Sequence, residues 1–154
     1  MEILNYALAT FFTFSGLLIG FILAVIAKEE LESGKDYYFL IQNLTFALIV
    51  FFVLFFNNLV IWLAVVIALL AYIFAGKSKI NHLAIYLSLA IIFNASFRNK
   101  LSLFIIVASL IFIHGVSTGT ILTYKLKNKK LRTLETILIK YGFFIPISLI
   151  LFLL

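Results

Sequence analysis

The sequence is poor in the residues that build soluble proteins and reactive sites. Its 154 residues include no cysteine, a single proline and only 12% charged residues. Without cysteine no disulfide can form, so the sequence gives no indication of redox compartment. A soluble domain usually has about 25% charged and about 45–50% apolar residues, whereas this chain is 65% hydrophobic. A water-soluble fold of this length could not bury so much apolar surface, and the composition therefore predicts a membrane protein.

Motifs for common chemistries are missing as well. The chain has no GxxxxGK(S/T), GxGxxG or HExxH sequence, so nucleotide loops and zinc-protease helices are not expected. No aspartate lies within a long apolar run, which excludes paired-aspartate chemistry inside a bilayer. One deep histidine without a second deep histidine or cysteine is not a metal site, since tetrahedral sites need three or four ligands. We therefore predict no catalytic residues, no metal and no cofactor, and the sequence does not favour an enzyme.

Six long apolar runs fill most of the chain. A helix needs about 20 residues, at about 1.5 Å each, to cross a hydrocarbon core of about 30 Å. The runs cover 4–27, 37–56, 59–75, 82–96, 101–124 and 136–154. Helices are expected because lipid cannot satisfy free backbone groups, and the alternating polarity of a β-barrel is absent. The predicted fold is an all-α polytopic membrane protein, a six-helix transmembrane bundle with short loops in one domain, 1–154. A re-entrant fourth run, the shortest, would change the topology after it.

The net charge of +6 is concentrated in alternate loops. The first, third and fifth loops contain Lys28, Lys35, Lys77, Lys79, Lys125, Lys127, Lys129, Lys130 and Arg132, whereas the second and fourth contain only Arg98 and Lys100. Basic loops remain in the cytoplasm, so both termini are predicted outside the cell membrane. The same residues predict contacts between the cytoplasmic loops and anionic lipid of the bilayer, rather than nucleic acid. The bias towards Ile, Leu, Phe, Lys and Asn is typical of an AT-rich prokaryotic genome.

Small residues form a stripe along the first run and another along the fifth. Residues three and four apart share a helix face, which groups Ala9, Thr13, Gly16 and Gly20, and likewise Ala108, Gly115, Gly119 and Thr123. Small side chains let helix backbones approach closely, so these two helices are predicted to touch. Tight packing within one subunit is favoured over a dimer contact. Both stripes carry the pattern GxxxGxIL, for which internal duplication and chance remain alternatives.

Polar residues within the runs are candidates for a functional site. His114, Ser117 and Thr118 are spaced i, i+3, i+4 and share one helix face. With Asn43 and Asn94 they are predicted to line a polar cavity, because ionisable groups inside membranes tend to face a cavity or a partner. The alternative is hydrogen bonding between helices, worth about 0.6 kcal/mol on average, with a neutral His114 bonded to a neighbouring helix.

Two further features concern the shape and edges of the bundle. Pro146 should free the carbonyl of Gly142, four residues earlier, and kink the last helix. Tyr6, Tyr37 and Trp62 fit the aromatic belts of a membrane protein.

Three functions are compatible with these patterns. The first is a transporter or channel-like protein for a small solute or ion, acting as an oligomer because six short helices enclose little space. The second is a non-enzymatic accessory or scaffold subunit that binds partner helices or anionic lipid. The third, least favoured, is a lipid-modifying enzyme that would use the carboxylates of the first loop, which are Glu29, Glu30, Glu32 and Asp36.

Overall fold

The computed structural model describes residues 2–77, 82–126 and 129–154, and these residues form helices joined by short connections. The helices are α1 (Glu2–Ile26), α2 (Glu30–Phe56), α3 (Ile61–Lys77), α4 (His82–Asn99), α5 (Leu101–Lys125), α6 (Lys130–Thr136), the π-helix η1 (Ile137–Tyr141) and α7 (Phe144–Leu153). Within these ranges there is no β-strand. The predicted all-helical membrane bundle is therefore confirmed.

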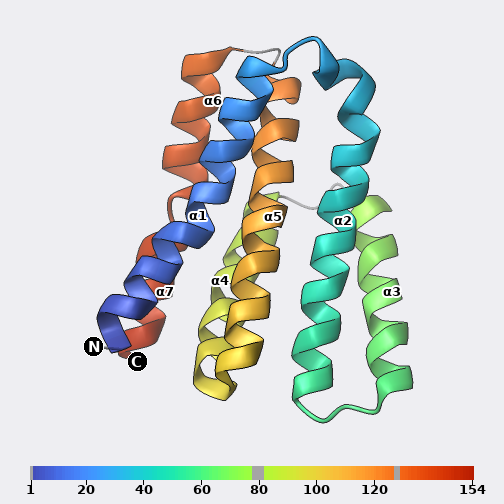
Figure 1. The fold of residues 1–154 in the computed structure, drawn as a ribbon, viewed down its shortest axis with the longest axis vertical. Helices are drawn as coiled ribbons and strands as arrows, with labels where there is room; N and C mark the ends of the chain where they lie inside the picture. Colours follow the sequence, from blue (N-terminus) through green and yellow to red (C-terminus); the bar gives the residue numbers. More distant parts are fainter. Residues whose placement is uncertain (1, 78–81, 127–128) are drawn as a thin grey trace.

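The helices differ in how far they can reach across a bilayer. Among the described residues, four segments are long and apolar enough to span it: Ile3–Ile26, Glu32–Phe56, Leu101–Lys125 and Lys130–Leu153. α3 has 17 residues and α4 has 18, which corresponds to about 26–27 Å at about 1.5 Å per residue. Both stop short of the level that α2 and α5 reach (Figure 1). Complete crossing by α3 and α4 remains a prediction.

Two helices begin earlier than the apolar runs suggested. α2 begins at Glu30, seven residues before the predicted start at 37, because nothing in the acidic segment prevents a helix from continuing beyond the apolar stretch. α6 begins at Lys130, so part of the predicted fifth loop is the first turns of the last helix. Hydropathy marks where a chain enters hydrocarbon, and helices extend past that boundary into water.

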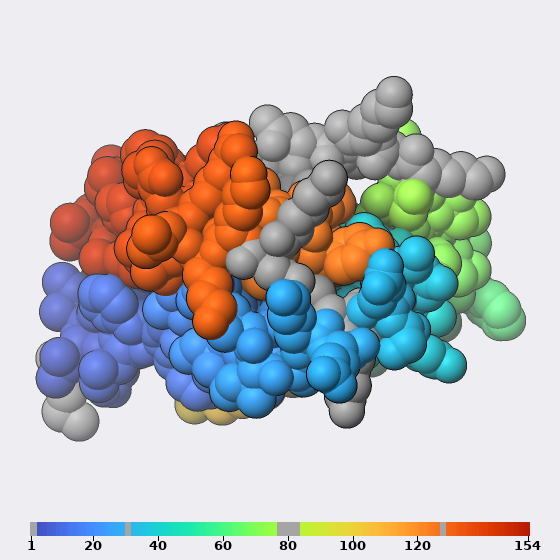
Figure 2. All heavy atoms as spheres, turned by 90° about the horizontal axis from the view of Figure 1, so that it is seen from above, coloured from blue at the N-terminus to red at the C-terminus, as the bar shows by residue number. Residues whose placement is uncertain are grey.

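The bundle is oblong in cross-section. α5 lies near its centre, α1 runs parallel to α5 and beside it, and both chain termini lie at one end (Figure 1). α2 packs against the other side of α5, and α3 packs mainly on α2. Seen from the end, α1 and the last span form one side and α2 with α3 forms the other (Figure 2). The core between α1, α4, α5 and α7 is rich in aromatic side chains, among them Tyr6, Tyr86, Phe93, Phe104 and Phe144.

The last span is interrupted near Pro146. The regular helix changes to the π-helix η1 and then to a turn at Gly142 and Phe143 before α7 begins. Pro146 has no N–H to offer the Gly142 carbonyl, which instead accepts from Ile145, three residues later, at 3.1 Å. Proline and a π-bulge are both common causes of helix kinks, and here Pro146 lies five residues after Tyr141, the last residue of η1.

Candidate functional site

α1 and α5 approach each other closely through glycines. A Cβ atom on Gly16 would collide with the carbonyl oxygen of Phe112, and one on Gly119 would collide with the carbonyl oxygen of Leu17. Gly20 faces the Val116 carbonyl in the same way. Contacts of this kind bring Cα–H groups against carbonyl oxygens and let dispersion act between backbones.

The other residues of the two stripes lie in or beside this interface. Thr13 and Thr123 are fully buried, and Ala108 is nearly so, while Ala9 is half-buried against the core. The Thr13 hydroxyl donates to its own helix at Ala9. Gly115 has a different neighbour, because a Cβ there would lie 2.8 Å from the Tyr86 hydroxyl and 3.1 Å from the Leu17 nitrogen. Gly115 thus makes room for a tyrosine from α4.

His114 lies at the centre of a buried polar cluster between α2 and α5. Its Nδ1 is 3.1 Å from the Gln42 carbonyl oxygen and 3.3 Å from the Thr45 hydroxyl. A carbonyl only accepts, so a bond to Gln42 places the proton of the neutral ring on Nδ1. The Gln42 amide also donates to the Thr118 hydroxyl at 2.9 Å. We call Gln42, Thr45, His114 and Thr118 the His114 cluster.

Only two of the five predicted cavity residues belong to this cluster, His114 and Thr118. The Ser117 hydroxyl donates to Ile113 of its own helix at 3.3 Å. Asn43 lies towards α3, where a Cβ on Gly76 would be 3.2 Å from its amide nitrogen. Asn94 is 3.4 Å from the Tyr6 hydroxyl, in a separate group near the opposite end of the bundle. Gln42 and Thr45 take the places that Asn43 and Asn94 were expected to fill.

The space beside the His114 cluster is very small. A cavity of about 10 Å³ is lined by Gln42, Thr118 and Tyr141, together with Lys125 at the end of α5. A cavity needs about 10–15 Å³ to hold one water molecule. The site is therefore compatible with a water-sized particle or a proton, and not with an organic solute in this conformation.

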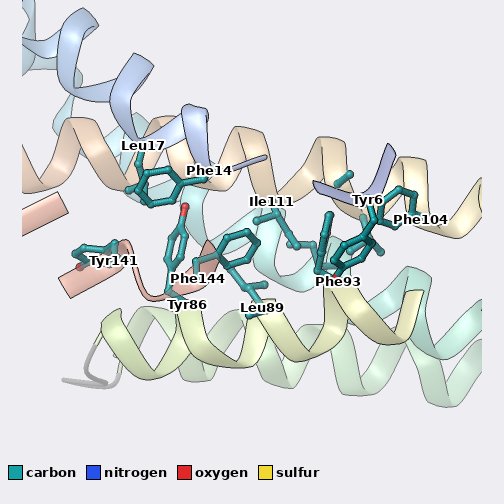
Figure 3. Close-up of a cluster of buried hydrophobic side chains, with 14 of the residues drawn as sticks. Tyr6, Phe14, Leu17, Tyr86, Leu89, Phe93, Phe104, Ile111, Tyr141 and Phe144 are labelled. Atoms are coloured by element: carbon teal, nitrogen blue, oxygen red, sulfur yellow. The ribbon is translucent and has the colours of Figure 1, made fainter. Parts of the chain in front are cut away.

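The interrupted last span packs directly against this region. Tyr141, the last residue of η1, makes an edge-to-face contact with Tyr86 at 5.2 Å between ring centroids. The Tyr86 ring lies 6.0 Å from the His114 ring, and its hydroxyl is directed towards α1 near Leu17 (Figure 3). Within the described part of the chain, the Tyr86 hydroxyl is fully buried without a hydrogen-bond partner. Neither tyrosine was identified from sequence, since an isolated tyrosine in an apolar run shows no pattern.

Tyr6 is buried in a second polar group and does not belong to an aromatic belt. It has no exposed surface, and its hydroxyl donates to the Ser148 carbonyl at 3.1 Å. The position of Tyr6 near the end of a span predicted a place at the membrane interface. Its burial contradicts that prediction. Trp62 and Tyr37 are 77% and 71% exposed, and their place at the membrane interface remains a prediction.

The acidic segment does not assemble into a site. Glu29, Glu32 and Asp36 are exposed on the connection to α2 and its first turns. Within the described ranges, no three His, Cys, Asp or Glu side chains group closely enough to hold a metal ion. Comparison with protein-family models, with curated proteins and with solved structures finds no match for this chain.

Proposed function

We propose that this protein is a small transporter or channel-like membrane protein for protons or a cation of similar size, with His114 as the ionisable group on the path. The proposal is carried by one observation: His114 is 2% exposed, lies within a membrane-spanning helix and is bonded to α2 through its Nδ1. Ionisable residues at such positions are costly, and they usually mark an ion or proton pathway. Histidine titrates near neutral pH and so can accept and release a proton under physiological conditions.

Two neighbouring features support a proton over a larger solute. The cavity of about 10 Å³ beside the His114 cluster leaves no room for more than about one water molecule. The break in the last span lies at the same depth, with Tyr141 lining that cavity. Interrupted helices in transporters commonly accompany the binding site and the moving parts. We expect the protein to act as an oligomer, because a single bundle of short, closely packed helices encloses little space.

Loss of His114 or of the Thr118 hydroxyl should slow proton movement strongly. We expect His114→Ala and Thr118→Val to lower proton flux by about tenfold or more, because a positioned proton-transfer group contributes at least that much. The measurement is the pH change inside sealed vesicles under an imposed potassium diffusion potential. Ser117→Ala is the control, since that hydroxyl bonds only its own helix among the described contacts. Unchanged flux in both test variants would count against this path.

We also propose that the basic end of the bundle faces the cytoplasm in the cell membrane, which leaves both termini outside. The chain has no cysteine, so a single introduced cysteine is the only thiol in the protein that can be labelled. Lys129→Cys at the basic end should react with a membrane-impermeant maleimide only after cell lysis, whereas Asn57→Cys at the opposite end should react in intact cells. Labelling of both positions, or the reverse order, would contradict the orientation.

A second candidate, the accessory or scaffold subunit, is favoured by the exposed position of α3. This helix packs mainly on α2, and its Trp62, Leu70 and Phe74 side chains are all at least 60% exposed. A surface of this kind is suited to a partner helix or to lipid. Copurification of a membrane protein at fixed stoichiometry, with no flux in vesicles, would favour this function over transport.

A further inference from the structure

Helices α3 and α4 are consecutive in the chain, yet an apolar groove separates them. The groove has a volume of about 700 Å³ and is lined by α2, α3 and α4. Its walls include Phe46 and Val50 from α2, Ile67 and Phe74 from α3, and Ile85 and Ser88 from α4. Ligand sites in proteins commonly have volumes of about 300–1,000 Å³. We call this feature the α3–α4 groove.

The residues that line the groove are almost all apolar, which favours a hydrocarbon occupant. Ser88 is the one residue with a polar side chain among those that line the groove, and its hydroxyl donates to Ile85 of its own helix at 2.7 Å. Water needs two to four polar partners and is not stabilised here. Leaving the space empty would forfeit dispersion contacts along all three helices. A flexible alkyl chain restores those contacts without leaving a polar group unsatisfied.

The charges near the ends of the groove indicate which class of lipid supplies the acyl chain. The groove extends along the second half of α3 and the first turns of α4, towards the end where α1 connects to α2 and α5 to α6 (Figure 1). α3 ends at Lys77, short of the level that α2 and α5 reach (Figure 1). Cations gather at the end beyond it, namely Lys28, Lys35, Lys125, Lys129, Lys130 and Arg132. The opposite end has only Arg98 and Lys100. Basic clusters beside membrane spans attract anionic lipid headgroups.

We propose that the α3–α4 groove binds one acyl chain of an anionic phospholipid whose headgroup lies at the basic end of the bundle. The bound chain supports α3, which otherwise packs mainly on α2. This site lies on the far side of α2 and α4 from the α1–α5 contact, and it does not depend on proton transfer by His114.

Photo-crosslinking tests the location directly on the unmodified protein. The probe is phosphatidylglycerol with a diazirine in the middle of one acyl chain, reconstituted with the protein in phosphatidylcholine vesicles. We expect crosslinked peptides to come mainly from 67–75 and 84–88. Crosslinks spread evenly over the exposed faces of α1, α5 and α7 would overturn the proposal, as would equal crosslinking by a phosphatidylcholine probe.

A matched pair of variants tests occupancy. Ala71 lines the groove, whereas Val66 lies on the same helix, exposed to lipid and outside it. Native mass spectrometry of detergent-purified protein should show bound phosphatidylglycerol for wild type and Val66→Phe, and its loss for Ala71→Phe. Retention by Ala71→Phe would overturn the proposal. A wild-type dimer that Ala71→Phe converts to a monomer would overturn it in favour of a second copy as the occupant.

Discussion

Leucine in place of Gly119 is expected to prevent normal assembly of the bundle. The new side chain would begin at a Cβ that already overlaps the Leu17 carbonyl and lies 3.0 Å from the Phe21 nitrogen. Backbone atoms cannot rotate away as a flexible side chain can, so α1 and α5 would have to separate. Overpacking typically costs about 1–3 kcal/mol and occasionally more, and contact with backbone atoms of two α1 residues places this change at the upper end. Gly16→Leu should behave similarly, against the Phe112 carbonyl.

Expression level and thermal unfolding in detergent measure this effect. Gly34→Ala in α2 is the control, because a Cβ there meets only the Tyr38 side chain, at 3.3 Å. Alanine within a helix is better than glycine by about 1 kcal/mol, and the far end of the Tyr38 side chain can shift, so the control should be neutral or slightly stabilising. Wild-type expression and melting temperature in both Gly16→Leu and Gly119→Leu would show that the α1–α5 contact is not tight.

Tyr6→Ala should cause the second large loss of stability, about 3–5 kcal/mol as for other buried aromatic truncations. The ring has no exposed surface and packs between Phe97, at 4.9 Å, and Phe152, at 4.6 Å between centroids. Its hydroxyl also links α1 to the Ser148 carbonyl of α7. Removing the side chain therefore opens a cavity and breaks the contact between the first and last spans.

Two further variants show how much of this loss comes from the hydroxyl and how much from burial of the ring. Tyr6→Phe keeps the packing but loses the bond to Ser148 and the longer bond from the Asn94 amide, so it should cost about 0.6 kcal/mol for each, the average for such bonds in membranes. Tyr37→Ala removes a side chain that is 71% exposed and should have little effect. The quantity to measure is the free energy of unfolding in mixed micelles containing a denaturing detergent. Equal losses for Tyr6→Ala and Tyr37→Ala would contradict the burial of Tyr6.

The neighbours Gln42 and Asn43 illustrate how far sequence could predict the site. Both are polar residues in the same span, and side chains one residue apart point about 100° apart around a helix. Gln42 faces α5 and bonds Thr118, whereas Asn43 faces α3. Sequence analysis chose Asn43 for the cavity because nothing in the run indicates which side of α2 meets α5. His114 and Thr118 were found together because both lie on one helix at a spacing of four.

Composition and the length of the apolar runs were sufficient to predict an all-helical membrane bundle, because only hydrocarbon surroundings accommodate such a chain. The glycine stripes also indicated a close contact between the first and fifth helices. The tertiary structure alone decided the burial of Tyr6, the pairing of Tyr86 with Tyr141 and the groove between α3 and α4. The reason is physical: in water a helix shows its buried face by being apolar on one side. A helix in lipid is apolar on all sides, so the face that meets another helix has no distinct pattern until the helices pack.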